Sequence, residues 1–260
     1  MKIISNLIVF VNRLLSSNKR VEKEKLPSQG LFYKDDFNLF IKRATKEDIA
    51  EYKLNFVKDD LGSIISKVKK IVENNLILPK NYKFHDLKSI DVVFLFIEIV
   101  KFTKSEKIKF KYVDEEKGEY KLVEFDSKYF NYYKLEEKYL NYYNEKEKLF
   151  IINDYKFSLP SIGVENSLTK FLIHKSKLPN SLVYNNYSYD FTYFLGHKNF
   201  ISFDEIDNLI EIFNSDLDDD EKQKIKKIIE IFLPLQKYSL IKDNKVIEIN
   251  SKIDLGNIWK

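Results

Sequence analysis

The segment DLKSIDVVFLFIEIVKFT, residues 86–103, is the most apolar part of the chain that has helical character. Between Asp91 and Lys101 the single charged residue is Glu98. A helix that is apolar on nearly all sides belongs inside a fold rather than at its surface. We therefore expect a helix here, buried at the centre of the N-terminal half, with the other elements of that half arranged around it.

The residues before this helix predict one strand and two further helices. The segment FNLFIKRAT, residues 37–45, has the character of a strand and ends at Thr45, a good helix N-cap. Asp48 follows three residues later, which is the spacing of a capping box, and the helix continues to about residue 56. The next segment, residues 61–76, repeats Ile and Val at helical spacing and ends at a pair of asparagines.

The residues after it predict hairpins and helices. Three segments alternate on both sides of a polar turn and are predicted β-hairpins: 108–125, 148–162 and 238–249. Five segments are predicted helices: 126–143, 166–175, 181–196, 202–213 and 217–234. No alternation of strands with helices of the parallel-sheet kind is present. The predicted fold class is therefore α+β, predominantly helical with small antiparallel β-hairpins.

Local signals mark several of these boundaries. The second hairpin is predicted to turn at Asn153-Asp154, and Ser202 with Glu205 has the spacing of a capping box. The acidic run at residues 218–220 precedes a lysine-rich stretch, which suits the positive end of a helix dipole. These signals predict where elements begin, independently of how they pack.

The stretch LPSQGLFY, residues 26–33, combines a turn signal with large apolar side chains. Pro27 fixes its own φ and Gly30 permits a positive φ, so the two predict a tight, non-helical elbow. Leu26, Phe32 and Tyr33 would be wasted in a solvated linker. Two interpretations follow: the elbow tucks onto the core of its own domain, or it docks onto a partner. All five residues are candidate partner-interface positions.

The first 25 residues predict an amphipathic helix of two to four turns followed by the polar linker SSNKRVEKEK. The helix is interrupted by asparagines and is too short and too polar for a signal peptide or a membrane span. Its apolar face, formed by Ile3, Leu7, Val11 and Leu14, packs either on its own domain or on a partner and is therefore a candidate partner interface. We expect residues 1–25 to form an arm, 26–145 an N-terminal subdomain of helices and hairpins, and 146–260 a C-terminal helical subdomain with a terminal hairpin and a docking tail.

The end of the chain, KIDLGNIWK, carries the single tryptophan of the sequence. Chain ends commonly fray, so a large aromatic side chain there needs a reason. Ile258 and Trp259 are therefore candidate docking residues, either onto the same chain or onto a partner.

The charge pattern argues against nucleic-acid binding. The sequence has 44 basic and 40 acidic residues and a formal net charge of +4. Arg13, Arg20 and Arg43 are its only arginines. Phosphate and base recognition favour the bidentate guanidinium group, whereas lysines mixed with glutamates indicate a solvated surface. Cysteine is absent, which removes disulfides, thiolate metal ligands and a cysteine nucleophile.

No motif predicts catalysis, a cofactor or a metal. The three histidines, His85, His174 and His197, lie in separate segments without zinc-site spacing. The run at 216–227 resembles a calcium loop at its first ligand positions, but it has Glu221 where the loop needs glycine and Lys227 where it needs glutamate. We therefore expect no catalytic, cofactor-binding or metal-binding residues.

LPSQGLFY, a strand ending in IKRAT and an acid-bearing helix start together resemble the opening of the baseplate hub proteins of T-even-type contractile-tail bacteriophages. SFDEIDNLIEIFN (202–214), FLPLQKYSL (232–240) and VIEINSKIDLGNIWK (246–260) resemble the second half of that family. The resemblance spans about residues 26–260.

The resemblance implies a non-enzymatic hub protein or hub-assembly chaperone in tail morphogenesis, whose partners are other phage tail and baseplate hub proteins. The charge pattern leads us to expect no nucleic-acid partner, the short apolar runs lead us to expect no membrane span, and self-association is left open. The protein would be found in the host cytoplasm during assembly or in the tail baseplate of the virion. Two alternatives remain: a cytosolic enzyme with an unrecognised carboxylate site, and a phage-encoded nucleic-acid-binding protein.

Overall fold

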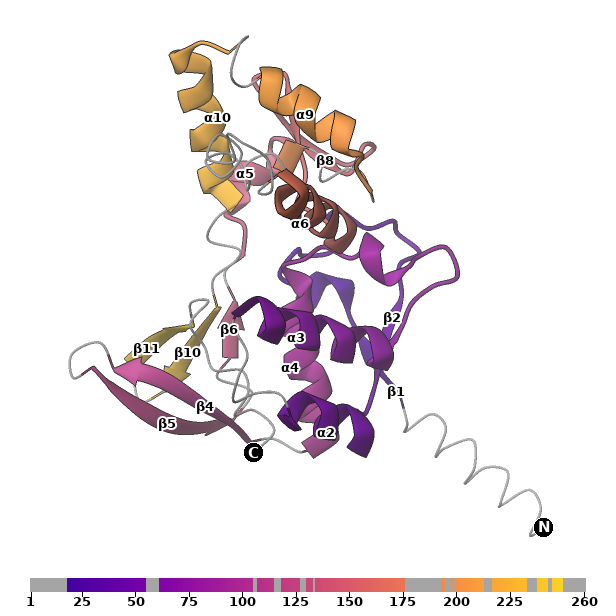
Figure 1. Ribbon diagram of the computed structural model, residues 1–260, viewed down its shortest axis with the longest axis vertical. Helices are drawn as coiled ribbons and strands as arrows, with labels where there is room; N and C mark the ends of the chain where they lie inside the picture. Colours follow the sequence, from indigo (N-terminus) through magenta and orange to yellow (C-terminus); the bar gives the residue numbers. More distant parts are fainter. Residues whose placement is uncertain are drawn as a thin grey trace.

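The computed structural model of the protein contains two groups of elements (Figure 1). One group surrounds α4 and the other contains α6, α9 and α10. The structure describes residues 18–54, 61–104, 107–114, 118–126, 130–132, 134–175, 193–194, 198, 200–212, 217–232, 238–242 and 245–249. The expected helix at 181–196 lies outside the described residues, apart from its positions 193–194.

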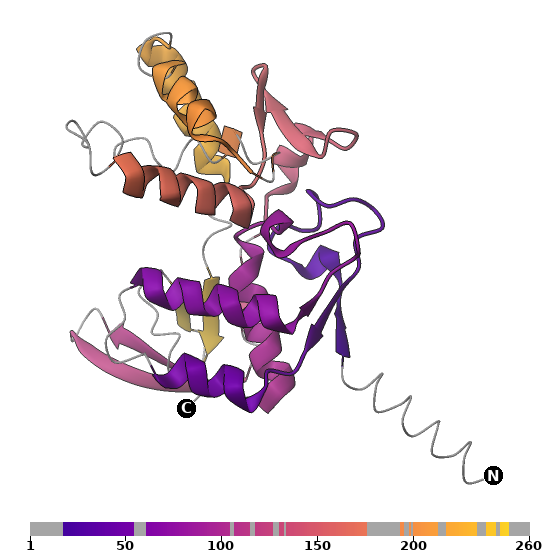
Figure 2. The same cartoon turned by 45° about the vertical axis from the view of Figure 1, so that its right-hand side comes forward.

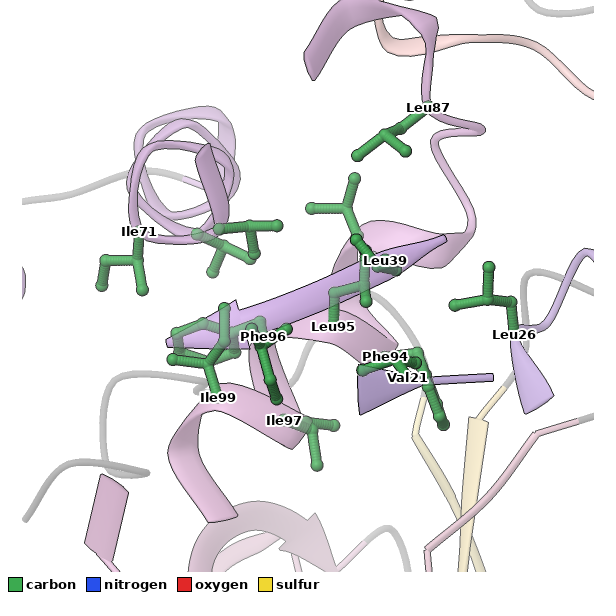
Figure 3. Close-up of a cluster of buried hydrophobic side chains, with 14 of the residues drawn as sticks. Val21, Leu26, Leu39, Ile71, Leu87, Phe94, Leu95, Phe96, Ile97 and Ile99 are labelled. Atoms are coloured by element: carbon green, nitrogen blue, oxygen red, sulfur yellow. The ribbon is translucent and has the colours of Figure 1, made fainter. Parts of the chain in front are cut away.

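Helix α4 (Asp91–Lys104) lies at the centre of the first group, as the sequence predicts. It contacts α3 (Leu61–Asn75) and strand β2 (Leu39–Lys42). In Figure 2, α3 and α2 (Lys46–Leu54) run across it. Its side chains Leu95, Phe96 and Ile99 are fully buried, and Figure 3 shows them in one cluster with Leu39 of β2 and Ile71 of α3. The apolar sequence of this segment is thus the centre of the first hydrophobic core.

A three-stranded antiparallel sheet closes one side of this core, in the order β1-β2-β3. Its first strand is β1 (Asn18–Val21), which pairs along its length with β2, and its third is β3 (Leu76–Ile77). The interpretation of SSNKRVEKEK as a polar linker is therefore wrong for residues 18–21, which form this strand. Val21 is buried in the core, whereas Lys19 reaches Glu98 of α4 at 2.7 Å. Backbone pairing and a single apolar anchor hold a strand whose other side chains are polar.

The predicted capping boxes are confirmed. At the start of α2, the Asp48 amide donates to the Thr45 hydroxyl, while the Thr45 amide donates to the Asp48 carboxylate. Helix α9 (Phe203–Glu211) starts with the same reciprocal bonds between Ser202 and Glu205. Helix α10 (Asp219–Phe232) is capped by Asp218, whose carboxylate accepts from the Glu221 amide at 2.8 Å.

The three predicted hairpins are confirmed. They are β4 (Lys107–Asp114) with β5 (Glu119–Asp126), β8 (Leu149–Ile152) with β9 (Tyr155–Phe157), and β10 (Tyr238–Lys242) with β11 (Lys245–Ile249). In the second hairpin Asn153 and Asp154 have φ of 48° and 65°, the left-handed values that such a tight turn needs.

The helix expected at residues 126–143 is not formed. The chain instead contains strand β6 (Phe130–Tyr132), the short helix α5 (Glu137–Leu140) and strand β7 (Tyr143–Asn144). Strand β6 pairs with β10, and β7 pairs with β8. Aromatic residues favour strands as readily as helices, and here the pairing with distant strands prevails over the local pattern.

The second group of elements encloses a second hydrophobic core. Helix α6 (Ile162–Lys175) contacts α9, and buried side chains of α6, α9, α10 and β8 form one cluster. Leu135 belongs to this cluster although it precedes the expected subdomain boundary at residue 145. The terminal hairpin β10–β11 joins β6 in one sheet and lies beside the first group in Figure 1. No helix among the described residues is both long and apolar enough to cross a membrane.

Candidate interaction site at the junction of the two cores

The elbow at residues 26–33 is a tight turn, as its sequence predicts. Gly30 has a φ of 74°, and a Cβ atom added there would lie 2.9 Å from Cγ of Lys23. Gln29 also has a positive φ, of 56°. Glycine is thus required at residue 30 for both its conformation and its close packing.

The large apolar side chains of the elbow divide between the two cores. Leu26 and Tyr33 are buried in the first core, around α4. Leu31 and Phe32 pack against the second core, where the Phe32 ring lies 5.9 Å from the ring of Phe150. A turn that places neighbouring residues in two cores joins them, which explains why so short a stretch holds four large apolar side chains.

The elbow is fastened to the first residue of α4 by a buried carboxylate. Asp91 is fully buried and accepts three hydrogen bonds. The Ser28 amide and hydroxyl donate to it at 2.9 and 2.8 Å, and the Tyr33 hydroxyl donates at 2.7 Å. The Tyr33 oxygen in turn accepts from the Lys88 amide at 2.9 Å. Every polar group in this network comes from the elbow or from residues 88–91.

A second set of bonds ties the start of α4 to the segment before α6. The Ile162 amide donates to the Leu87 carbonyl at 2.8 Å, and the Ser89 amide donates to the Pro160 carbonyl at 3.0 Å. Between them, the buried ammonium group of Lys88 donates to the Ser158 hydroxyl at 3.2 Å. Residues 87–91 therefore bind the elbow on one side and the second group on the other.

Burial dominates the electrostatics of this junction. It raises the pKa of Asp91 to about 6, although the bonds from Tyr33 and Ser28 and the nearby Lys88 oppose the change. It lowers the pKa of Lys88 to about 7, against the attraction of Asp91 and Asp86. Burial and the Asp91 charge raise the pKa of Tyr33 well above its ordinary value. Each charged form is disfavoured because water is excluded from the group.

A cleft of about 480 Å³ opens beside this junction. Its walls come from the elbow, from the segment before α4, from the β7–β8 turn and from the segment before α6. The lining residues are Phe32, Lys34, Asp35, Asn81, Tyr82, Asp86, Lys88, Lys146, Glu147, Lys148 and Ser158. Polar and charged groups predominate, with Phe32 and Tyr82 as its two aromatic rings.

The structure separates the candidate residues that the sequence grouped together. Leu26, Pro27, Gly30 and Tyr33 are covered by the chain itself, so here they are core residues rather than partner-facing ones. Phe32 is half-buried and lines the cleft. The remaining candidates lie outside the described residues: Ile3, Leu7, Val11, Leu14, Ile258 and Trp259.

Sequence reasoning missed Asp91 and Lys88. Both lie at the boundary of the apolar helix, where Asp91 has the ordinary character of an acid in a first helical turn. Their partners Ser28, Tyr33 and Ser158 lie 55 to 70 positions away, so no local spacing reveals the network. The one available signal was the elbow, whose polar Ser28 and Tyr33 hydroxyl must find partners if its apolar side chains are buried.

Among the described residues, no group of histidine, aspartate and glutamate side chains could hold a metal ion. In the acidic run, Asp218 serves as a helix cap. Comparisons of the chain with protein-family models, with curated proteins and with solved structures found no match.

Proposed function

We propose that the protein acts through protein–protein contacts in the assembly of the baseplate hub of a contractile phage tail, as a hub subunit or an assembly chaperone. The observation that carries this proposal is the ordered resemblance across residues 26–260, which begins at the elbow. Its partners are other tail and baseplate hub proteins. It works in the host cytoplasm during assembly, or stays in the tail baseplate of the virion.

Exposed apolar side chains support a role in protein contacts. Phe200 and Ile173 are 68% and 57% exposed, and Ile212 and Phe203 are 43% and 38% exposed. All four belong to α6, to α9 or to the residues beside α9. Single exposed apolar side chains are normal on a protein surface, and these four support a partner contact because the helices that carry or flank them, α6 and α9, lie against each other.

The two alternative functions find less support. The cleft contains three acidic residues, but each accepts a hydrogen bond from a neighbour: Asp35 from Lys148, Glu147 from Lys156 and Asp86 from the Lys83 amide. Lysines across the described surface also pair with acids, including Lys101 with Glu98 and Lys175 with Asp207. A nucleic-acid-binding face would need lysines free of such partners.

Co-purification from phage-infected cells tests the proposal. The tagged protein should recover tail or baseplate proteins, and analysis of mature particles then separates a hub subunit from a transient chaperone. Phe200→Ser should lower that recovery, whereas Tyr142→Ser, which changes another exposed aromatic residue, should not. Recovery of no tail protein, or equal recovery by Phe200→Ser and the parent chain, would count against a role through this surface.

A further inference from the structure

The cleft beside the junction presents more positive charge to a ligand than the numbers of its lysines and acids suggest. Its lining includes three acids and four lysines. The acids are already engaged: Lys148 lies 3.2 Å from Asp35, and Lys156 lies 2.6 Å from Glu147. Asp86 accepts from the Lys83 amide at 2.7 Å and also lies 3.5 Å from the ring of His85. A ligand entering the cleft therefore meets two acids that already have a lysine partner, Asp35 and Glu147, and one, Asp86, that is held by a backbone amide.

The remaining lysines differ in their surroundings. Lys34 and Lys146 are exposed at the rim, and neither forms an ion pair with a described residue. Lys88 is 6% exposed, donates to Ser158 and lies 5.3 Å from the centre of the Phe32 ring. The cleft thus has one deeply placed amine, an aromatic ring beside that amine, and two amines at its mouth.

The aromatic ring beside Lys88 favours a carboxylate attached to an apolar group as the ligand. An ammonium group binds carboxylate and phosphate alike, so the amines alone do not choose between the two anions. Lysine binds an anion as a point charge, and the Phe32 ring offers an apolar surface beside that charge. A carboxylate attached to an apolar group satisfies both features. The volume of about 480 Å³ lies in the range of ligand-sized cavities.

We propose that this cleft binds the carboxylate of an acidic segment of a partner protein, with Lys88 as its counter-ion and Phe32 as its apolar wall. The proposal rests on the proposed function, because it names the chemistry of the partner. The rim lysines draw the acidic segment towards the mouth, and Lys88 meets one carboxylate at depth. The segment, rather than a free small anion, is favoured because the binding groups extend from the buried amine to the exposed rim.

Binding is coupled to protonation of Lys88. Burial lowers the pKa of this amine to about 7, and the groups facing it are Asp86 and Asp91 on its own segment, Tyr33 and Phe32 of the elbow, and Ser158. A bound carboxylate stabilises the ammonium form and raises that pKa. Affinity should therefore fall as pH rises above about 7, by up to roughly tenfold per pH unit, while one proton is taken up on binding.

Titration calorimetry of the full chain tests this with two probe peptides, acetyl-Phe-Glu-Glu-Leu-amide and its Phe-Gln-Gln-Leu counterpart. The acidic peptide should bind and the amide peptide should not, and binding should weaken between pH 7 and pH 9. Lys88→Met should lower affinity at least tenfold and abolish the pH dependence, whereas Lys80→Met, outside the cleft, should leave both unchanged. If Lys88→Met does not fold, the exposed double variant Lys34→Gln/Lys146→Gln should still lower affinity several-fold.

Three outcomes overturn the site. They are no binding of the acidic peptide at millimolar concentration, equal binding of both peptides, or binding by Lys88→Met and by Lys34→Gln/Lys146→Gln that equals that of the parent chain. Citrate and inorganic phosphate serve as competitors, and binding of either as tightly as the peptide would mark a small-anion site and overturn the partner segment. If tail proteins co-purify equally with the parent and with Lys88→Met, this site fails while the proposed function stands.

Discussion

Asp91 and Asp48 are two carboxylates in the first turns of neighbouring helices, and each accepts three hydrogen bonds from uncharged donors. Asp91 accepts from the Ser28 amide, the Ser28 hydroxyl and the Tyr33 hydroxyl. Asp48 accepts from the Thr45 amide and from the side chains of Asn74 and Asn75. Yet the pKa of Asp91 is raised to about 6, and the pKa of Asp48 is lowered.

The difference between the two carboxylates is the access of water. Asp91 is completely buried, so the loss of hydration outweighs its hydrogen bonds and the attraction of Lys88. Asp48 keeps 9% of its surface exposed; burial also acts to raise its pKa, but the bonds from Thr45, Asn75 and Asn74 together prevail. An equal set of donors therefore stabilises one ionised acid and fails to compensate the burial of the other.

The largest expected effect is that of Asp91→Ala. The change leaves the Ser28 amide, the Ser28 hydroxyl and the Tyr33 hydroxyl without their acceptor and removes the charge opposite Lys88. Unsatisfied buried donors cost about 1–3 kcal/mol each, so we expect a loss of roughly 3–5 kcal/mol in the free energy of unfolding. Urea denaturation measures it. Asp36→Ala, at an exposed site, is the control, and a loss below about 1 kcal/mol would contradict the network.

The second prediction concerns pH. Because the pKa of Asp91 is raised in the folded protein, the folded state holds its proton more tightly than the unfolded state. The contribution of Asp91 to the free energy of unfolding is fully present below about pH 4 and is lost as pH rises through about 6. The parent chain should lose on the order of 2–3 kcal/mol relative to Asp91→Asn between these values. Denaturation at pH 4, 5, 6 and 7 measures the difference, and a relative gain across this window would show that hydration is not the dominant cause.

A smaller effect is expected at Asp48, with the opposite sign in pH. Asp48→Asn should lower the free energy of unfolding by about 1–2 kcal/mol at neutral pH, because one acceptor oxygen becomes a donor beside Asn74 and Asn75. The deficit should shrink as pH falls through the lowered pKa of Asp48, where the parent carboxylate is itself protonated. Glu47→Gln, at the exposed neighbouring position, is the matched control. A deficit that grows in acid would be inconsistent with this account.

The smallest effect belongs to a carboxylate at the surface. Asp218 caps α10, and Asp218→Ala should cost about 0.5–1 kcal/mol, while Asp220→Ala in the same acidic run should cost less. Titration with calcium to millimolar concentration should release or absorb no heat of binding and should leave the melting temperature unchanged, because the acidic run serves as a helix cap. Saturable calcium binding would instead support the metal-loop interpretation and reopen the enzyme alternative.

The same contrast explains which features the sequence could predict. Thr45 with Asp48, Ser202 with Glu205, and the turn at Asn153-Asp154 were found because their interactions join residues within a few positions. Helix α4 was predicted because an apolar run of its length is commonly explained as a buried helix. These are interactions that the chain can make locally, wherever the rest of the molecule lies.

The features that were missed depend on distant partners. Strand β1 contains one buried apolar residue, Val21, and is held by pairing with β2. Strand β6 was taken for part of a helix because its partner β10 lies about a hundred residues away. The Asp91 network and the cleft likewise need two or more segments to be placed side by side. Periodicity along one segment carries no information about such contacts.

The pairing of β6 with β10 has a consequence for synthesis. Tyr132 pairs with Tyr238, so the ribosome must add 106 residues after β6 before its partner exists. At roughly 5–20 residues per second, that interval lasts about 5–20 s. Throughout it, Phe130–Tyr132 lack the strand that pairs with them, and their backbone donors and acceptors are open to other partners. The β10–β11 hairpin is thus a late closure, and the newly made protein passes through a stage in which a chaperone or another chain could occupy the place that its own hairpin finally takes.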